Sequence, residues 1–169
     1  FLSIQDPRER PVEKQQAADQ SHRRFACESS DFVSILRLWR HVEEQRQEAS
    51  AGQFRRLCQR EFLSWLRLRE WRDIHHQLRI VARELGLREN RDVASDETLH
   101  RAVLAGMLTH IGIRTEEREY EGVRNRRFSV HPGSFLFRKQ SKWVVCAELV
   151  ETTRLYGRVA AAIDPDWVF

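Results

Sequence analysis

The chain has 169 residues, of which 41% are hydrophobic and 32% charged, with a formal net charge of +4. This length and composition allow one ordinary domain or two small ones with a real apolar core, which excludes a disordered tail. The pI of about 9.3 favours polyanionic partners, although a well-solvated surface gives the same balance. Lysine is rare, and arginine suits bidentate phosphate contacts and base stacking, although a compositional bias of the genome would also produce this excess.

The cysteines and the apolar runs give no sign of a disulfide framework, a zinc site or a membrane partner. Cys27, Cys58 and Cys146 lie far apart, with no C-x-x-C pair and no histidine at ligand spacing, so a reducing cytoplasm is the simplest location. No apolar stretch approaches membrane length, and the start lacks a signal peptide. Because the first residue is Phe1 rather than Met, we read the chain as a fragment or a processed piece.

Residues 1–11 are expected to form a connector from an upstream domain, since Pro7 and Pro11 favour an extended path. Helical spacing of apolar residues then predicts a helical domain over 12–111. Asp31 is expected to N-cap the first clear helix. The apolar positions of three successive helical stretches are Phe32, Ile35, Leu36, Trp39 and Val42, then Phe54, Leu57, Phe62, Leu63 and Leu66, then Trp71, Ile74, Leu78, Val81 and Leu85 before a C-cap at Gly86.

A polar loop follows, and Ser95 is expected to start another helix that runs through Met107 and that Gly112 can end. Beyond Gly112 the hydrophobic period changes to two, and residues 126–130, 142–150 and 152–163 look like strands. The sequence therefore predicts an α+β organisation, with a helical bundle first and a small five-stranded β-barrel over 112–169.

No motif for chemistry is visible. The phosphate-binding pattern G-x-x-x-x-G-K-[ST] is absent, as is Asp-Glu-Ala-His, so no bound ATP or magnesium is expected within this chain. His75 and His76 are adjacent, and neighbouring helical residues point too far apart to chelate one ion together. We assign no catalytic residue and no metal ligand.

The last predicted strand carries the best binding candidates. Its alternation puts Arg154, Tyr156 and Arg158 on one face, and it puts Leu155, Val159 and Ile163 on the other, as core. Charge beside an aromatic surface is what a β-barrel needs to bind single strands, although a polar outer face would look the same. Arg124, Arg126 and Arg127 are expected in a loop where their charges reach outward, or in a plain solvated turn. The arginines of the helices are expected mainly to decorate outer faces, and the tryptophans to be core anchors.

Ordered motifs at both ends of the chain carry a family resemblance. Near the end, the strand-like Lys142 to Val145 lies between a His-Pro-x-Ser turn and a Thr-Thr pair, and a Pro-Asp-Trp ending follows. These motifs resemble the last domain of DEAH-box RNA helicases. The segment Ser3 to Pro11 resembles the opening of the helicase-associated domain, most closely in the bacterial HrpA type. The remaining motif residues are His131, Pro132, Gly133, Ser134, Thr152, Thr153, Pro165, Asp166 and Trp167.

The resemblance implies a helical ratchet domain and an oligonucleotide-binding (OB) fold that together form one wall of an RNA channel. Upstream motor and winged-helix domains of the same chain would bind ATP and magnesium and step along RNA 3′ to 5′. The family's RNA-contacting serine and arginine fall on Ser3 and Arg10, and the turn of the OB-fold falls on His131 to Ser134. Where many relatives have Asn-Tyr, this chain has Ser64-Trp65, so the hydrogen bonds of that asparagine must be made otherwise.

We therefore expect an RNA-guiding accessory module that contacts single-stranded RNA. The rival from another class is a protein-interaction module that docks a helicase activator or another partner protein, because helical bundles and OB-folds also bind proteins. Salt distinguishes the two, since phosphate contacts weaken steeply as salt rises. A stand-alone nuclease or deaminase is a third possibility, and the lack of a carboxylate or metal constellation argues against it.

Overall fold

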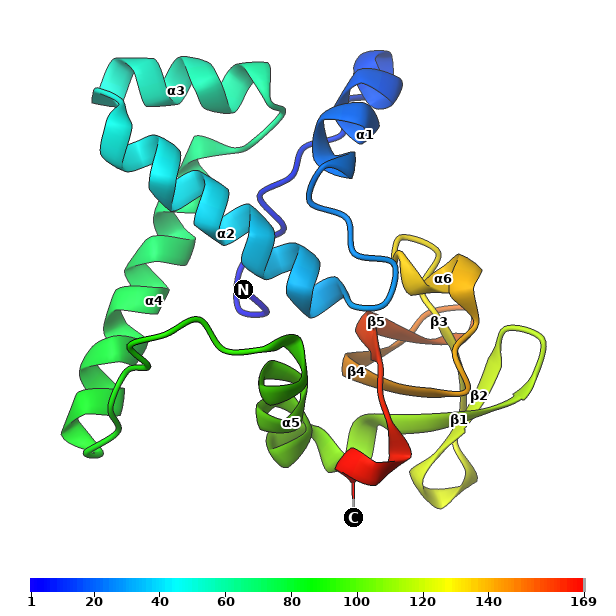
Figure 1. Ribbon diagram of the computed structural model, residues 1–169. Coiled ribbons are helices and arrows are strands. Elements are labelled where there is room, and N and C mark those ends of the chain that lie inside the picture. The colour runs from blue at the N-terminus through cyan, green and yellow to red at the C-terminus, as the bar shows by residue number, and fades with distance from the viewer. Residues whose placement is uncertain (169) are drawn as a thin grey trace. The chain divides into compact units, whose positions relative to one another are not determined.

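The structure is a computed structural model that describes residues 1–168. The chain forms two compact units, each built from two segments. One unit joins Phe1–Phe25 with Arg37–Val93, and the other joins Ala26–Leu36 with the residues from Ala94 onward. Helix α2 (Asp31–Glu48) belongs to both, because its first residues lie in the second unit and the rest lie in the first (Figure 1).

The first unit is helical, as expected. Besides most of α2 it contains the short 3-10 helix η1 (Val12–Lys14), α1 (Gln15–Arg23), α3 (Ala51–Arg60) and α4 (Trp65–Glu84). Helix α3 starts at a capping box in which the Ser50 side chain accepts from the backbone N–H of Gln53, while the Gln53 side chain accepts from that of Ser50. Helix α1 was not foreseen, because its sequence QQAADQSHR carries only the buried Ala18 as an apolar signal.

The helical stretch expected through Leu66 is interrupted. Helix α3 ends at Arg60, Phe62 has a left-handed φ of 56°, and Leu63 pairs with Arg8 in an isolated β-bridge. Ser64 then caps α4 by accepting from the backbone N–H of Arg67 at 3.4 Å. Ser64 therefore supplies the capping acceptor that an asparagine would provide at this position.

The apolar stripe of α4 is only partly buried. Trp71 is buried and packs on Trp39, with ring centroids 4.8 Å apart. Farther along the same stripe, Leu78, Val81 and Leu85 are 61%, 49% and 71% exposed. The helix ends where predicted, because Gly86 adopts a φ of 74° and the backbone N–H of Leu87 donates to the carbonyl of Ala82.

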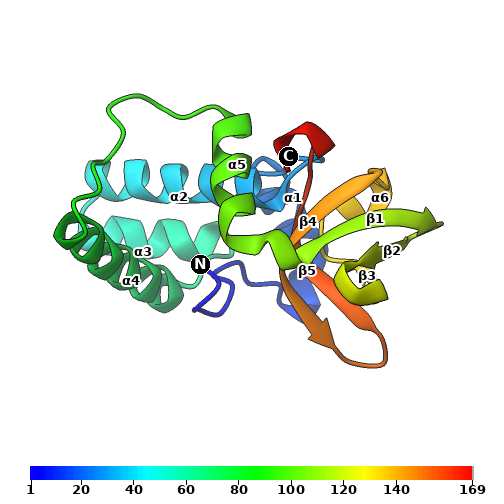
Figure 2. The ribbon, with the colours of Figure 1, turned by 90° about the horizontal axis from the view of Figure 1, so that it is seen from below.

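The second unit is a closed barrel with strand order β1-β2-β3-β5-β4 (Figure 2). Strands β3 and β5 pair in parallel, the other neighbours are antiparallel, and β1 closes the barrel against β4. The predicted α+β fold with a five-stranded barrel is confirmed. The elements are α5 (Asp96–Met107), η2 (Leu108–His110), β1 (Ile111–Glu116), β2 (Glu119–Gly122), η3 (Val123–Asn125), β3 (Arg127–Val130), α6 (Leu136–Lys139), β4 (Trp143–Glu151), β5 (Leu155–Ala162) and η4 (Pro165–Trp167).

Gly112 has a different role from the expected helix terminator. Helix α5 already ends at Met107, and Gly112 lies within β1. A Cβ atom at Gly112 would lie 2.4 Å from Cζ of Phe128, so the bare backbone lets this core ring pack against the strand. Strands β1 and β2 were not foreseen, because the charged residues of this hairpin hide the alternation of a half-buried strand.

Two apolar clusters organise the second unit. The barrel interior contains the buried Tyr120, Phe128 and Val144. A second cluster joins Leu104 of α5 to β4 and β5. Because α5 packs on these strands, the compact units do not divide at Gly112, where the hydrophobic period changes.

The expected alternation of the last strand fails at one residue. Leu155 packs against the barrel core and Ile163 is buried, as predicted. Val159 was also expected in the core, but it has a left-handed φ of 53° and stays partly exposed. This irregularity lets Gly157 and Ala160, three residues apart, both be buried.

Candidate nucleic-acid interface

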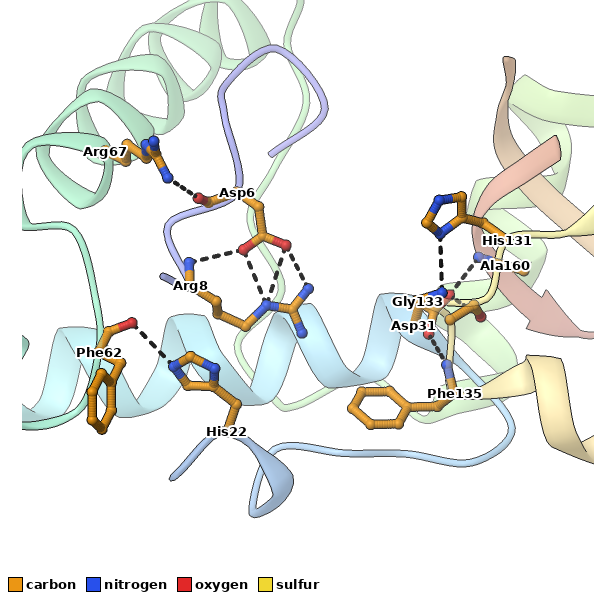
Figure 3. Close-up of polar contacts among 11 residues, drawn as sticks. Asp6, Arg8, His22, Asp31, Phe62, Arg67, His131, Gly133, Phe135 and Ala160 are labelled. Carbon is orange, nitrogen blue, oxygen red and sulfur yellow. Dashed lines mark hydrogen bonds and ion pairs between the residues drawn. The ribbon is translucent and has the colours of Figure 1, made fainter. Parts of the chain in front are cut away.

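The turn from His131 to Ser134 is fastened to the first turn of α2 by one carboxylate. Ser134 Oγ donates to Asp31 Oδ2 at 2.5 Å, and the backbone N–H of Phe135 donates to Oδ1 at 3.2 Å. The backbone N–H of Ala160 in β5 donates to Oδ2 at 2.8 Å (Figure 3). Asp31 is 9% exposed, so this carboxylate joins the turn, the strand and the helix inside one unit.

Asp31 does not cap α2, which corrects the sequence-based expectation. The capping acceptor is Ser30, whose hydroxyl oxygen accepts from the backbone N–H of Val33 at 3.2 Å. Ser30 also bonds through Oγ to Nε2 of the buried His100 at 2.6 Å. The carboxylate of Asp31 is thus left for the barrel, a role that sequence reasoning missed because the donors follow more than 100 residues later.

The same turn directs an imidazole to the surface. His131 Nδ1 accepts from the backbone N–H of Gly133 at 3.0 Å (Figure 3), so the proton of the neutral ring lies on Nε2. The ring is exposed and meets Tyr156 edge to face, with centroids 5.7 Å apart. Ser134 is placed differently, because its hydroxyl donates to Asp31 and accepts from the backbone N–H of Leu136 at 3.2 Å.

Of the three residues expected on one face of the last strand, Tyr156 and Arg158 lie in β5, and Arg154 lies in the bend before it. Tyr156 is half-exposed and pairs in register with Ser129 of β3, next to the turn that carries His131. Arg154 and Arg158 are exposed, and Arg158 NH1 lies 3.6 Å from Oε1 of Glu148. The structure therefore groups Tyr156 with His131, and a carboxylate partly offsets the charge of Arg158.

The basic loop before β3 is also exposed, as expected. Arg124 and Asn125 have left-handed φ values of 59° and 56°, which form a tight bend. Arg127 lies at the start of β3 and pairs with Glu119 at 3.0 Å. Within residues 1–168, Arg124 and Arg126 have no ion pair, so these two guanidiniums keep their donors for an outside anion.

The opening segment is attached to the helical unit instead of running free. The backbone N–H of Glu9 donates to the carbonyl of Phe62 at 2.8 Å. Arg67 NH1 donates to the carbonyl of Asp6 at 2.9 Å (Figure 3). Ser3 lies in an exposed turn. These bonds anchor the segment that precedes Arg10.

Arg10 has an acidic partner that the sequence did not indicate. Its guanidinium holds Asp19 of α1 with two bonds, Nε to Oδ1 at 2.7 Å and NH2 to Oδ2 at 2.8 Å. The hydrogen bond from Arg10 lowers the pKa of Asp19, and the side chains of Arg10 and Asp19 are 57% and 45% exposed.

No catalytic constellation emerges among the described residues. Burial raises the pKa of Cys58 to about 11 and that of Cys146 to about 12, which keeps both thiols protonated. No cluster of three or more potential metal ligands occurs in residues 1–168. In the same part of the chain no helix combines the length and the apolarity needed to cross a membrane.

Residues 99–169 match the family model of the oligonucleotide/oligosaccharide-binding (OB)-fold. The barrel is an OB-fold. The strand order of the barrel and the parallel contact of β3 with β5 agree with this match. The His131 turn and Tyr156 both lie within the matched residues.

Comparison with curated proteins extends the similarity to almost the whole chain. The chain is 54% identical over 168 residues to the ATP-dependent RNA helicase HrpA homolog of Haemophilus influenzae and to the ATP-dependent RNA helicase HrpA of Escherichia coli. Each match covers 99% of this chain and 13% of the relative. The HrpA of Borreliella burgdorferi is 21% identical over 159 residues, covering 94% of this chain and 19% of the relative. The expected resemblance to HrpA-type DEAH-box helicases is confirmed, and the chain spans a small part of these proteins.

Proposed function

We propose that this chain is the RNA-guiding module of an ATP-dependent RNA helicase and that its OB-fold contacts single-stranded RNA. The observation that carries the proposal is the His131–Tyr156 pair, which the Asp31-fastened turn holds at the surface of the barrel. An exposed imidazole and a phenol ring offer stacking surfaces for bases, and the exposed Arg154, two residues before Tyr156 in the chain, offers a phosphate contact. The relatives are named ATP-dependent RNA helicases, which favours RNA as the ligand.

The contacts proposed for the individual residues differ in kind. Direct stacking contacts with RNA bases would come from His131 and Tyr156. Phosphate contacts would come from the exposed arginines Arg124, Arg126, Arg127, Arg154 and Arg158. Ser134 would act by holding the turn, because its hydroxyl is already engaged by Asp31 and Leu136. Ser3 and Arg10 would contribute from the helical unit, where Arg10 can exchange its exposed carboxylate partner for a phosphate.

The proposed mechanism assigns no chemistry to this chain. Motor and winged-helix domains elsewhere in the same polypeptide would bind ATP and magnesium and step along RNA 3′ to 5′. This module would hold the strand after each step through phosphate contacts and stacking, in the cytoplasm. Sequence-tolerant binding is expected, since every base presents a flat surface to an aromatic ring.

A titration tests the proposal. Fluorescently labelled oligouridine is added to the chain at several salt concentrations, and the affinity is compared with that of Tyr156→Ala and Arg154→Ala. We expect weak, salt-sensitive binding that Tyr156→Ala reduces without changing the salt slope and that Arg154→Ala reduces with a shallower slope. Arg101→Ala is the matched control, because Arg101 is paired with Glu97 on α5. Equal affinities of all variants would refute the proposed surface.

A second candidate function is a protein-interaction module, and the exposed stripe of α4 favours it. Leu78, Val81 and Leu85 lie on one helical face and are between 49% and 71% exposed. A contiguous exposed apolar face is typical of a surface that a protein covers. Binding there would respond little to salt, and Leu78→Ser with Val81→Ser would abolish it while leaving RNA affinity unchanged.

A further inference from the structure

Two arginines of the helical unit are stacked on one indole ring. Trp65 is the first residue of α4 and is half-buried. The guanidinium carbon of Arg55, from α3, lies 4.1 Å from the centroid of the Trp65 ring. That of Arg69, one turn farther along α4, lies 5.9 Å from the same centroid. We call these three residues the Trp65 stack.

Stacking leaves the hydrogen-bond donors of these arginines available. A guanidinium that lies over an aromatic ring uses its flat face, whereas its N–H groups point outward in the plane. Within the described part of the chain, Arg55 and Arg69 make neither an ion pair nor a side-chain hydrogen bond. Both side chains are therefore held in place by the ring with their bidentate edges unused, which lowers the entropic cost of binding an anion.

A half-open pocket of about 430 Å³ lies beside the stack, lined by Trp65 and Arg69 but not by Arg55. Its wall has an apolar part made by Trp65, Phe54 and Leu68. The charged lining consists of Arg46, Arg69 and Arg72 with one carboxylate, Asp73. An aromatic and apolar wall next to the Arg69 guanidinium suits a ligand that carries both a flat ring and negative charge.

The two neighbouring arginines of the pocket, Arg46 and Arg72, already form ion pairs with a carboxylate. Arg46 NH2 lies 3.2 Å from Glu43 Oε2, and Arg72 Nε lies 3.1 Å from Glu43 Oε1. Glu43 thus occupies the two arginines of the pocket that do not stack. The anion-binding capacity of this surface is concentrated in the two arginines of the Trp65 stack.

We propose that the Trp65 stack and the adjoining pocket form a second binding site for single-stranded nucleic acid, separate from the OB-fold surface. Arg55 and Arg69 bind a backbone phosphate through their in-plane N–H groups, and the pocket accepts the neighbouring base or sugar against its apolar wall. This site rests on the proposed function, since it requires that the chain binds RNA.

The test compares charge and stacking separately. The double variant Arg55→Ala/Arg69→Ala removes two phosphate contacts, and Arg55→Lys/Arg69→Lys keeps the charges but loses the stacked, bidentate geometry. Affinity for oligouridine is measured by fluorescence anisotropy between low and high salt. The matched control is Arg79→Ala/Arg101→Ala, which removes two charges whose partners are Glu89 and Glu97. Circular dichroism and melting temperature verify the fold of each variant.

We expect the alanine variant to lose roughly tenfold or more in affinity at low salt. Its plot of log affinity against log salt should be shallower by about 1.4, since each lost contact to a single strand removes about 0.7. The lysine variant should keep the wild-type slope and still bind more weakly. The control should change both quantities much less than the alanine variant.

Failure of this site is distinguishable from failure of the proposed function. If Tyr156→Ala and Arg154→Ala weaken binding while both Trp65-stack variants behave like the control, the second site is refuted and the OB-fold surface stands. If the wild-type chain binds no oligouridine, the proposed function fails as well. Binding of polyglutamate that depends on Arg55 and Arg69, without RNA binding, would assign the stack to an acidic peptide and overturn the proposal.

Discussion

Each unit contains a buried carboxylate at a junction of its elements, and their contacts differ. The donors to Asp31 in the barrel unit include two backbone N–H groups and a hydroxyl. Glu61 in the helical unit meets two basic side chains, Arg24 at 2.5 Å and His41 at 2.8 Å. Both residues are 9% exposed, so burial alone does not decide which kind of partner a carboxylate takes.

The difference shows what each junction tolerates. The N–H of Ala160 is fixed in β5 and buried with its residue, so it cannot reach water when its acceptor is lost. The Arg24 side chain is 44% exposed and can be hydrated without Glu61. Loss of the carboxylate therefore leaves a buried donor unsatisfied in the barrel unit. In the helical unit, water can hydrate the Arg24 side chain when Glu61 is lost.

Replacing Asp31 should have the largest effect on stability. Asp31→Ala leaves three donors without their acceptor, and each buried unsatisfied group costs about 1–3 kcal/mol. We expect the free energy of unfolding of the barrel unit to fall by at least about 3 kcal/mol, measured by urea denaturation. Asp31→Asn, which keeps the shape and one good acceptor, should lose less. A loss under about 1 kcal/mol for Asp31→Ala would break the comparison.

Replacing Glu61 should cost less, although its carboxylate is equally buried. Glu61→Gln keeps the shape but removes the charge that faces Arg24 and His41. We expect a loss of about 1–2 kcal/mol in the free energy of unfolding, since Arg24 can turn to water. Urea denaturation beside Asp31→Asn, its isosteric counterpart, gives the ranking. A loss for Glu61→Gln that exceeds that of Asp31→Ala would reverse the comparison.

The histidine behind the Asp31 junction should make the barrel unit sensitive to acid. Burial lowers the pKa of His100, which stacks on Trp167 and bonds to Ser30. The neutral ring is favoured in the folded state, so its contribution is present above about pH 6.5 and is lost as the pH falls through the lowered folded pKa. The slope is at most about 1.4 kcal/mol per pH unit.

Denaturation between pH 7.5 and 5 measures this dependence. His100→Gln, which cannot be protonated, should flatten the part of the profile that belongs to the barrel unit. Burial also lowers the pKa of His22 in the helical unit, with the same sign. His22→Gln is therefore the matched control, and it should leave the barrel transition unchanged. An identical acid profile in wild type and His100→Gln would contradict the assignment.

Arg10→Ala should have the smallest effect on stability. Its bonds to Asp19 are made at the surface, where water can replace them. We expect an unchanged melting temperature together with weaker, less salt-dependent RNA binding in the longer helicase that we propose contains this chain. Asp19→Ala breaks the same pair but frees Arg10, so it should spare or strengthen binding. A similar loss of RNA affinity in both variants would show that the ion pair, and not the arginine, is what matters.

The sequence predicted the fold where local patterns carry enough information. The change of hydrophobic period near Gly112 marked the transition from helices to the barrel. Ser95 caps the start of α5 and Gly86 follows the end of α4, as predicted. Charged hairpin strands and a helix with one buried alanine lack such a pattern. Helix α4 shows the reverse case, since its apolar stripe is regular and yet Leu78 is exposed. A regular stripe therefore predicts the helix but does not show that its apolar face is buried.

The candidate site was predictable in its residue types but not in its geometry. The turn and the β5 face were identified as separate features, and only the fold brings His131 beside Tyr156. Asp31 looked like a helix cap, because its donors at Ser134 and Ala160 are remote in sequence. The partner of Arg10 was missed for the same reason, since Asp19 is close only once α1 has formed.

The placement of residues 26–36 limits where this chain can be divided. This segment lies before the helical stretch 37–93, yet it belongs to the barrel unit, where Ser29 accepts from the backbone N–H of Ala162 at 2.8 Å. A barrel expressed from Ala94 onward would lack both that acceptor and Asp31. During synthesis on the ribosome, more than a hundred residues are added after residues 26–36 before strand β5, with which this segment bonds, is made. In sequence, the helical segment 37–93 is thus an insertion within the barrel unit. A circular permutant that joins residues 26–36 to the rest of the barrel unit keeps these contacts, whereas truncation at Ala94 removes them.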